Sequence, residues 1–227
     1  MQRQKLTQKQ WYESPPPLRG QDKIEGAAGV HIEQLERLFP TRNAHLSLNC
    51  GCGSGVQHNI FPNSVGIDIS FHNVRSVLIA GGRGVVADME FLPFRDKTFD
   101  VVYGFGILHH LGDIRKGISE GARVLKEGGS IGFGAENNGL CPLNYALSFV
   151  YGNWKIEKGF YRIRPALLRK IFRESHITDI KISHHGMVIY GLGGMIYRLT
   201  SRMEEWFTTF KLLKPFLGYC YISGKKI

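Results

Sequence analysis

Three glycines at alternate positions are the residues in this sequence that point most directly to chemistry. Gly51, Gly53 and Gly55 follow the apolar run 46–50, so a buried strand is expected to lead into a sharp turn. Because glycine has no Cβ, the backbone of such a turn can press against a ligand. In a parallel sheet the turn would lie at the carboxyl ends of the strands, where such folds bind ligands. The sequence therefore predicts a ligand site at this turn.

Two aspartates follow the next expected strands. Asp68 ends the run 64–68, where a carboxylate can accept two hydrogen bonds from the vicinal hydroxyls of a ribose. Asp88 follows the run 84–87 and can accept a hydrogen bond from an exocyclic amine such as that of adenine. Either aspartate alone would serve equally well as a helix cap or a solvated loop carboxylate. Together with the glycine turn they predict a nucleoside-binding site.

Short apolar runs alternate with helical stretches along the chain and would position these residues. The expected strands are residues 46–50, 64–68, 84–87, 99–103, 130–134, 177–182 and 219–223. A helix is expected at 113–126, ended by Gly128 and Gly129, and another at 165–175. This alternation predicts an α/β fold: a Rossmann-like, seven-stranded, mostly parallel sheet with helices on both faces.

One main domain is expected. Residues 1–26 contain three successive prolines and lack a hydrophobic period, which predicts a mobile amino-terminal arm. Residues 27–227 are predicted to form a single domain, because the last strand returns to the sheet after a helical insertion at about 187–216. The insertion is too apolar for a solvated connection, so it is expected to be a lid over the acceptor pocket or a membrane-surface contact.

Composition and charge limit the class of protein. The chain is 43% hydrophobic and 21% charged, which excludes a disordered or collagen-like chain. Its net charge is +10, and residues 151–227 hold 14 basic and 5 acidic residues. No signal peptide is evident, and the uncharged stretch 186–197 is shorter than the ~20 residues that span a bilayer. A cytoplasmic protein with four reduced cysteines is predicted.

Six motifs occur in order between residues 30 and 136. They are NCGCGSG (49–55), GIDIS (66–70), ADMEFLPF (87–94), TFDVVY (98–103), LHHL (108–111) and VLKEGGS (124–130). In this order they resemble the class I S-adenosylmethionine-dependent methyltransferases. The resemblance is greatest to the small-molecule group that includes the ubiquinone and menaquinone biosynthesis enzymes.

The resemblance implies S-adenosylmethionine as cofactor and assigns residues to it. The glycine turn would hold the methionine part, Asp68 the ribose and Asp88 the adenine. The implied cofactor-binding residues are Asn49, Gly51, Cys52, Gly53, Gly55, Asp68, Ile69, Asp88, Met89, Gly104 and Phe105. Asn49 stands where the family usually has an acid, which keeps the hydrogen-bonding reach but removes a negative charge facing the cationic cofactor.

The candidate catalytic residues are His109 and His110. Methyl transfer from a sulfonium needs alignment and exclusion of water, and needs a base only if the nucleophile carries a proton. An imidazole titrates near neutrality and can take that proton. In the alternative, His110 only shapes the pocket. Glu136, expected on the same rim, would contact the substrate or be a solvated loop carboxylate.

No metal site is predicted. Cys50 and Cys52 have no further ligands at zinc-site spacing. Adjacent histidines, if they lie on a strand, point to opposite faces and would not bind one ion together.

Three functions remain open from the sequence. The first is a methyltransferase with a small-molecule substrate that is hydrophobic or anionic. The second is an RNA methyltransferase, because basic and aromatic residues interleave between 154 and 173. The third is an inactive methyltransferase-like scaffold, motivated by Asn49 and the short 55–68 connection. A nicotinamide-binding unit is disfavoured, since Val56 replaces the expected third glycine and Pro62 interrupts the helix.

Overall fold

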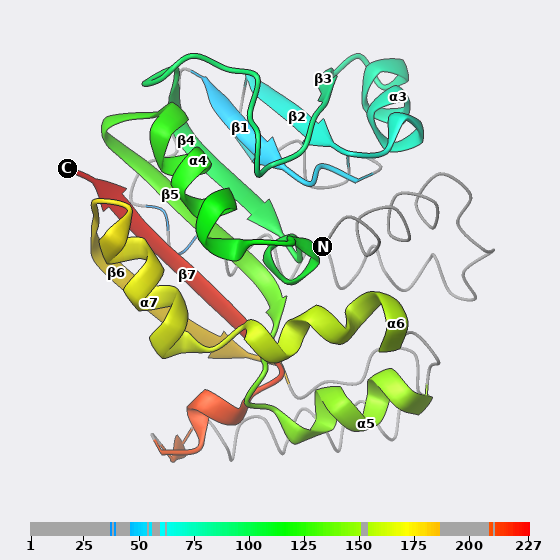
Figure 1. Ribbon diagram of the computed structural model, residues 1–227, viewed down its shortest axis with the longest axis vertical. Coiled ribbons are helices and arrows are strands. Elements are labelled where there is room, and N and C mark those ends of the chain that lie inside the picture. The colour runs from blue at the N-terminus through cyan, green and yellow to red at the C-terminus, as the bar shows by residue number, and fades with distance from the viewer. Residues whose placement is uncertain are drawn as a thin grey trace.

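Seven strands form one sheet in the order β3-β2-β1-β4-β5-β7-β6 (Figure 1). The computed structural model describes residues 37, 39, 46–53, 55, 60–61, 63–150, 154–186, 209–210 and 212–227. The strands are β1 (Ser47–Cys50), β2 (Ser64–Asp68), β3 (Arg83–Val86), β4 (Phe99–Phe105), β5 (Leu125–Asn137), β6 (Ile177–His185) and β7 (Tyr219–Lys226). All pairs are parallel except those of β7, which runs antiparallel to β5 and β6. The predicted mostly parallel α/β sheet of seven strands is confirmed.

Helices lie between the strands and beyond the end of β5. They are α3 (Phe71–Ile79), α4 (Ile114–Val124), α5 (Pro142–Val150), α6 (Trp154–Glu157), α7 (Pro165–Glu174) and the 3-10 helices η2 (Leu108–His110), η3 (Lys158–Arg162) and η4 (Lys214–Phe216). Helices α4 and α7 cover the same face of the sheet (Figure 1). The arm predicted at 1–26 lies outside the described residues, as do residues 187–208 and 211 of the predicted insertion.

The core forms where the apolar runs of the sequence meet. Strand β1 lies between β2 and β4, and all four of its residues are buried. Phe133 of β5 packs edge-on against Phe172 of α7, and this contact holds the helix against the sheet. The central position of β1 fixes the backbone from which the glycine turn begins.

Helix α4 ends earlier than the sequence predicted. Asp113 caps its start by accepting hydrogen bonds from the backbone nitrogens of Arg115 and Lys116. The helix stops at Val124, and β5 begins at once with the fully buried Leu125. The last carbonyls of α4 accept hydrogen bonds from the backbone nitrogens of residues 97 and 98, so the glycines at 128 and 129 are not needed as a stop.

Two further features of the described residues are the state of the cysteines and the length of the helices. The four cysteines are all buried, and none of them is paired in a disulfide bond. Within the described ranges, no helix combines the length and the apolarity that crossing a bilayer requires.

Candidate functional site

A cavity of about 220 Å³ lies at the carboxyl ends of β1, β2 and β4. Eight predicted site residues line it: Gly51, Gly53, Asp68, Ile69, Asp88, Met89, Phe105 and His110. Five others lie outside its lining: Asn49, Cys52, Gly55, Gly104 and His109. The carboxyl ends of parallel strands lie at one edge of the sheet, and residues from four separate parts of the chain therefore meet at this cavity.

The glycine turn has the backbone geometry that its composition indicates. Gly51, Gly53 and Gly55 have φ angles of +70°, +52° and +93°, a region that residues with a Cβ rarely adopt. A Cβ on Gly51 would lie 2.8 Å from Cδ1 of Ile107, whereas one on Gly53 would meet nothing within 4 Å. The turn is therefore packed at Gly51 and open toward a ligand at Gly53.

The predicted residues outside the lining support the turn and the sheet. The Cys52 side chain is fully buried, and its backbone nitrogen donates to the carbonyl of Ile67 at 2.9 Å. A Cβ on Gly104 would lie 2.6 Å from the carbonyl oxygen of Cys50, so glycine lets β4 approach β1 closely. Gly55 packs against Val77 of α3.

Asp68 connects the glycine turn to the start of α3. Its Oδ2 accepts a hydrogen bond from the backbone nitrogen of Gly53 at 3.1 Å, and its Oδ1 accepts one from Ser70 at 2.9 Å. Ser70, not Asp68, caps α3, because its Oγ accepts from the backbone nitrogen of Asn73. Each carboxylate oxygen can accept more than one hydrogen bond, so Asp68 can bind a ligand while holding the turn.

Asp88 occupies the corresponding place after β3. Its Oδ1 accepts a hydrogen bond from the backbone nitrogen of Glu90 at 2.9 Å. Met89 beside it is 3% exposed and also lines the cavity. Asp68 and Asp88 thus both line the cavity.

Asn49 is the unexplained polar residue of this region. Its side chain is 0% exposed, and within the described part of the chain neither Oδ1 nor Nδ2 has a hydrogen-bond partner. A buried amide without partners is costly. The open backbone at Gly53 and the two aspartates, without this amide, are polar groups that the cavity offers to an adenosyl cofactor with an amino-acid tail.

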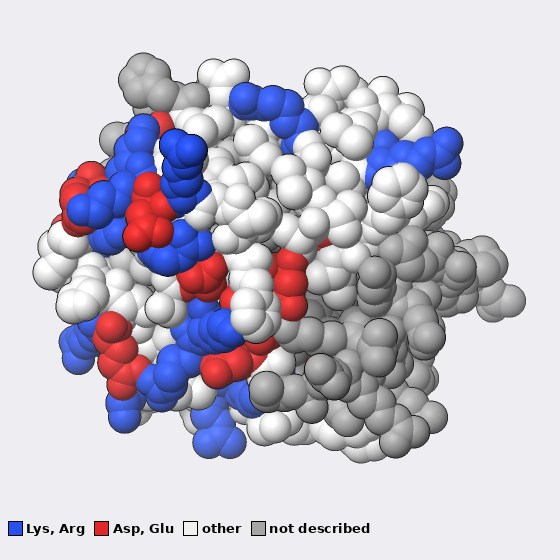
Figure 2. All heavy atoms as spheres, turned by 45° about the horizontal axis from the view of Figure 1, so that its top comes forward, with Lys and Arg blue, Asp and Glu red and all other residues white. Residues whose placement is uncertain are grey.

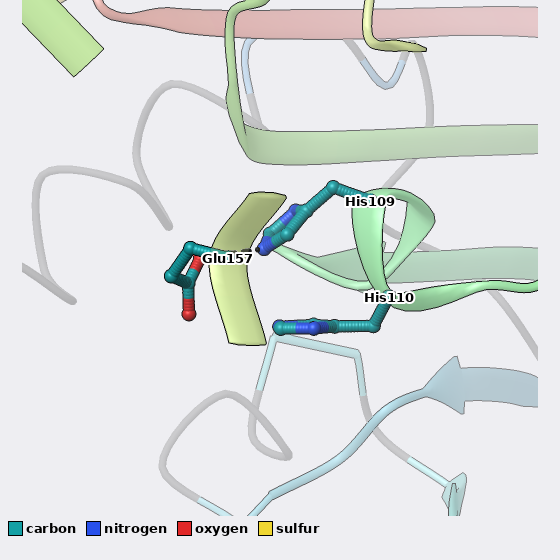
Figure 3. A group of neighbouring side chains, drawn as sticks. All are labelled: His109, His110 and Glu157. Carbon is teal, nitrogen blue, oxygen red and sulfur yellow. Dashed lines mark hydrogen bonds and ion pairs between the residues drawn. The ribbon is translucent and has the colours of Figure 1, made fainter. Parts of the chain in front are cut away.

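The two histidines lie on η2, the 3-10 helix that follows β4. On the 3-10 turn their ring centroids are 4.0 Å apart. Both side chains extend toward α6, which carries Glu157 (Figure 3). The argument from strand geometry therefore does not apply to this pair.

His109 is held between two carboxylates. It is 3% exposed, its Nδ1 lies 2.8 Å from Oε2 of Glu136, and its Nε2 lies 3.0 Å from Oε2 of Glu157. Glu136 also accepts hydrogen bonds from the backbone nitrogens of Ile107, Leu108 and His109. Glu136 is part of β5, fully buried and outside the cavity lining, so it is neither a solvated loop carboxylate nor a residue that contacts the cavity.

The surroundings give the two histidines opposite charge states. Burial disfavours an imidazolium, but the hydrogen bonds and charges of Glu136 and Glu157 outweigh it and raise the pKa of His109 to about 10. Burial, reinforced by the positive charge of His109, lowers the pKa of His110 to about 3. At neutral pH both ring nitrogens of His109 donate, and His110 is a weakly basic neutral ring. Both ring nitrogens of His109 are engaged by carboxylates, whereas His110 lines the cavity and its role as general base stays a prediction.

Sequence reasoning missed Glu157 and the inward role of Arg162. Arg162 was expected on a basic surface, yet its guanidinium donates to the carbonyl oxygens of His109, Leu111 and Gly112 at 3.2, 2.6 and 3.0 Å. The one available signal was that Glu157 is the single acidic residue between 154 and 173.

Comparisons with known proteins agree with this geometry. Residues 48–133 match a family model described as a methyltransferase domain. The uncharacterised protein MJ1252 of Methanocaldococcus jannaschii is 29% identical over 241 residues, which cover 99% of this chain and 93% of that protein. The sterol 4-C-methyltransferase strm-1 of Caenorhabditis elegans is 32% identical over 130 residues, 51% of this chain and 38% of that relative, so the match spans well under half of the relative's length.

A solved structure shows the same fold. The crystal structure of an S-adenosylmethionine-dependent methyltransferase from Thermotoga maritima matches with a TM-score of 0.63 and 19% identity, over 90% of this chain and 91% of that one. Fold, domain match and the cavity at the strand ends lead to one assignment: residues 48–133 are a methyltransferase domain, the chain has the fold of the S-adenosylmethionine-dependent methyltransferases, and S-adenosylmethionine is its cofactor.

Proposed function

We propose that this methyltransferase transfers a methyl group to a small-molecule acceptor with a hydrophobic body. The observation that carries the proposal is the apolar wall beside His110, where Phe105, Ile107 and Leu111 line the cavity. A site of this kind favours apolar ligands oriented by a few polar groups. The name of the relative strm-1, a sterol 4-C-methyltransferase, agrees with a hydrophobic acceptor.

The residues of the cavity divide between holding the cofactor and facing the acceptor. In the proposal, the turn at Gly51 and Gly53 receives the methionine part, Asp68 the ribose hydroxyls, and Asp88 with Met89 the adenine. When bound, S-adenosylmethionine supplies a methyl group that is already activated on a sulfonium. The task of the protein is then to align the acceptor and exclude water, and the buried apolar wall is suited to this.

An RNA acceptor was the alternative, and the described surface does not favour it. Arg162 is turned inward, and Arg115 and Lys170 both pair with Glu174 on the surface. Figure 2 shows basic and acidic side chains interspersed over one face rather than a uniformly basic area. RNA binding relies on a positive surface that follows the phosphate backbone.

Transfer of a radioactive methyl group separates the two acceptors. The purified chain is incubated with S-adenosylmethionine carrying a tritiated methyl group, together with either a lipid and small-molecule extract or total tRNA. The Asp68→Ala variant is the control for cofactor-dependent labelling. We expect label in the organic-extractable fraction, and label confined to tRNA would overturn the small-acceptor proposal.

A further inference from the structure

Glu157 joins two parts of the chain that are far apart in sequence. It is the last residue of α6, and its Oε2 accepts hydrogen bonds from Nε2 of His109 at 3.0 Å and from Nδ2 of Asn137 at 3.2 Å. Its side chain is 22% exposed, whereas that of His109 is 4% exposed. The contact therefore reaches from a partly exposed helix into the buried turn η2.

Segment 154–162 contacts η2 at two more points, through Arg162 and Gly159. The Arg162 guanidinium on η3 donates to three carbonyl oxygens at and just after η2. Gly159 packs so closely against the carbonyl of His109 that a Cβ there would overlap it. On the opposite side, Glu136 of β5 accepts hydrogen bonds from three successive backbone nitrogens of the same turn. The turn is thus held from both sides.

The turn held in this way is a wall of the cavity. Ile107, His110 and Leu111, which belong to η2 or flank it, all line the cavity. Since backbone and ring contacts fix η2 between β5 and segment 154–162, a shift of that segment would move this wall. Interactions of this kind can set the geometry of a site without touching its ligand.

The charges of the group favour an ion network over a bound metal. Atoms of His109, His110 and Glu157 that are able to ligate a metal lie within 4.8 Å of one another. However, Nε2 of His109 already bonds Glu157, and the positive charges of His109 and Arg162 balance the negative charges of Glu136 and Glu157. A divalent cation would have to displace a proton and add positive charge beside Arg162.

We propose that Glu157 is a positioning residue for methyl transfer: acting through His109, it fixes η2 and thereby the cavity wall that carries His110. The proposal deepens the proposed function, because it rests on the cavity being the place of reaction. The groups that face His109 are Glu136 from β5, Glu157 from α6, Arg162 from η3 and its neighbour His110.

The test compares Glu157→Ala with Glu157→Gln in the full chain. The amide oxygen of Gln can still accept the hydrogen bond from Nε2 of His109, whereas Ala cannot. Calorimetric titration with S-adenosylhomocysteine should show affinity about 5–20-fold weaker for Glu157→Ala, with most of it restored in Glu157→Gln. Glu174 forms an exposed ion pair with Arg115, and the control variant Glu174→Gln should bind S-adenosylhomocysteine as tightly as the unaltered protein does. Equal affinity in all four proteins would overturn the proposal.

Nitrogen-15 spectra of the histidine rings test the network without any cofactor. In the unaltered protein one histidine should keep both ring nitrogens protonated at pH 8, and in Glu157→Gln it should lose a proton at lower pH, because one carboxylate charge is gone. A neutral His109 at pH 7 in the unaltered protein would overturn the proposal, as would a one-to-one shift of its ring signals on addition of Zn²⁺. If the unaltered protein fails to bind S-adenosylhomocysteine, the proposed function of the cavity is wrong. The spectra would still show whether His109 is charged and held by Glu157.

Discussion

Replacing Glu136 by Gln should destabilise the protein strongly, although the two side chains have the same shape. The carboxylate accepts hydrogen bonds from the backbone nitrogens of Ile107, Leu108 and His109 at 2.8, 2.9 and 3.3 Å, and from Nδ1 of His109 at 2.8 Å. A Gln side chain has a single acceptor oxygen, so its amide nitrogen would face hydrogen-bond donors whichever way the amide is turned.

The expected loss is about 3–5 kcal/mol, the usual cost of removing one partner of a buried ion pair. Glu136 is 0% exposed and His109 3% exposed, so solvent cannot replace the lost interaction. Two of the donors would each lack an acceptor, at about 1–3 kcal/mol for a buried group, which agrees with that range. The loss is a large part of the ~5–15 kcal/mol by which domains are stable.

Urea denaturation measures the effect. With a typical slope of about 2–3 kcal/mol per molar, the midpoint should fall by roughly 1–2 M. Glu174→Gln is the matched control, since its side chain is 42% exposed and surface changes usually stay within about 0.5 kcal/mol. A loss below about 1 kcal/mol for Glu136→Gln would refute the reasoning, because the charge and all four contacts would then be dispensable.

The difference in the free energy of unfolding between the unaltered protein and Glu136→Gln should depend on pH, and its direction follows from the pKa of His109. The folded protein raises the pKa of His109 to about 10, from about 6.5 in an unfolded chain. The stability that this provides is therefore complete below about pH 6.5 and is lost as the pH rises through the folded value. The gap between the unaltered protein and Glu136→Gln should narrow as the pH is raised from 6.5 to 9.

Three further predictions concern the cavity and the cysteines. Asp68→Asn should weaken S-adenosylhomocysteine binding by about 1–3 kcal/mol in calorimetry, because the charge is lost and the new amide faces the backbone nitrogen of Gly53; unchanged affinity would remove Asp68 from the site. Gly51→Ala should lower the free energy of unfolding by about 1–3 kcal/mol in urea, since φ is +70° and the new methyl group meets Ile107; a neutral effect would mean that the turn readily adopts another shape. All four cysteines are buried, so a thiol reagent such as Ellman's reagent should label them slowly in the native protein and fully in urea, and rapid native labelling of all four would contradict their burial.

The approximate positions of the strands along the chain could be predicted because each is a short apolar run between turn residues. The first and last residues of a strand could not be predicted where pairing with another strand determines them. Strand β5 was expected at 130–134 but runs from Leu125 to Asn137, because Leu125 pairs with Phe99 of β4 and Asn137 with Tyr219 of β7. Such partners lie 26 or more residues away, and local periodicity carries no information about them.

The glycine and aspartate residues of the cavity could be predicted from local motifs, and the network around His109 could not. Gly51, Gly53, Asp68 and Asp88 each end a strand or follow one within three residues, so the rule for the carboxyl ends of parallel strands brings them together. Glu157 lies 48 residues from His109, in a stretch whose other charged residues are all basic. Only the folded chain shows that this carboxylate turns inward.

The adjacent histidines show how burial divides one residue type into two roles. His109, enclosed by Glu136 and Glu157, is a cation that serves the structure, and its charge contributes to lowering the pKa of His110. His110 consequently presents a neutral ring to a cavity that also holds the carboxylates of Asp68 and Asp88. A cationic sulfonium would be repelled by an imidazolium on that wall and is not repelled by a neutral ring. The positive charge in the LHHL motif is thus kept behind the wall, between two carboxylates, and the residues that line the cavity are neutral or negative.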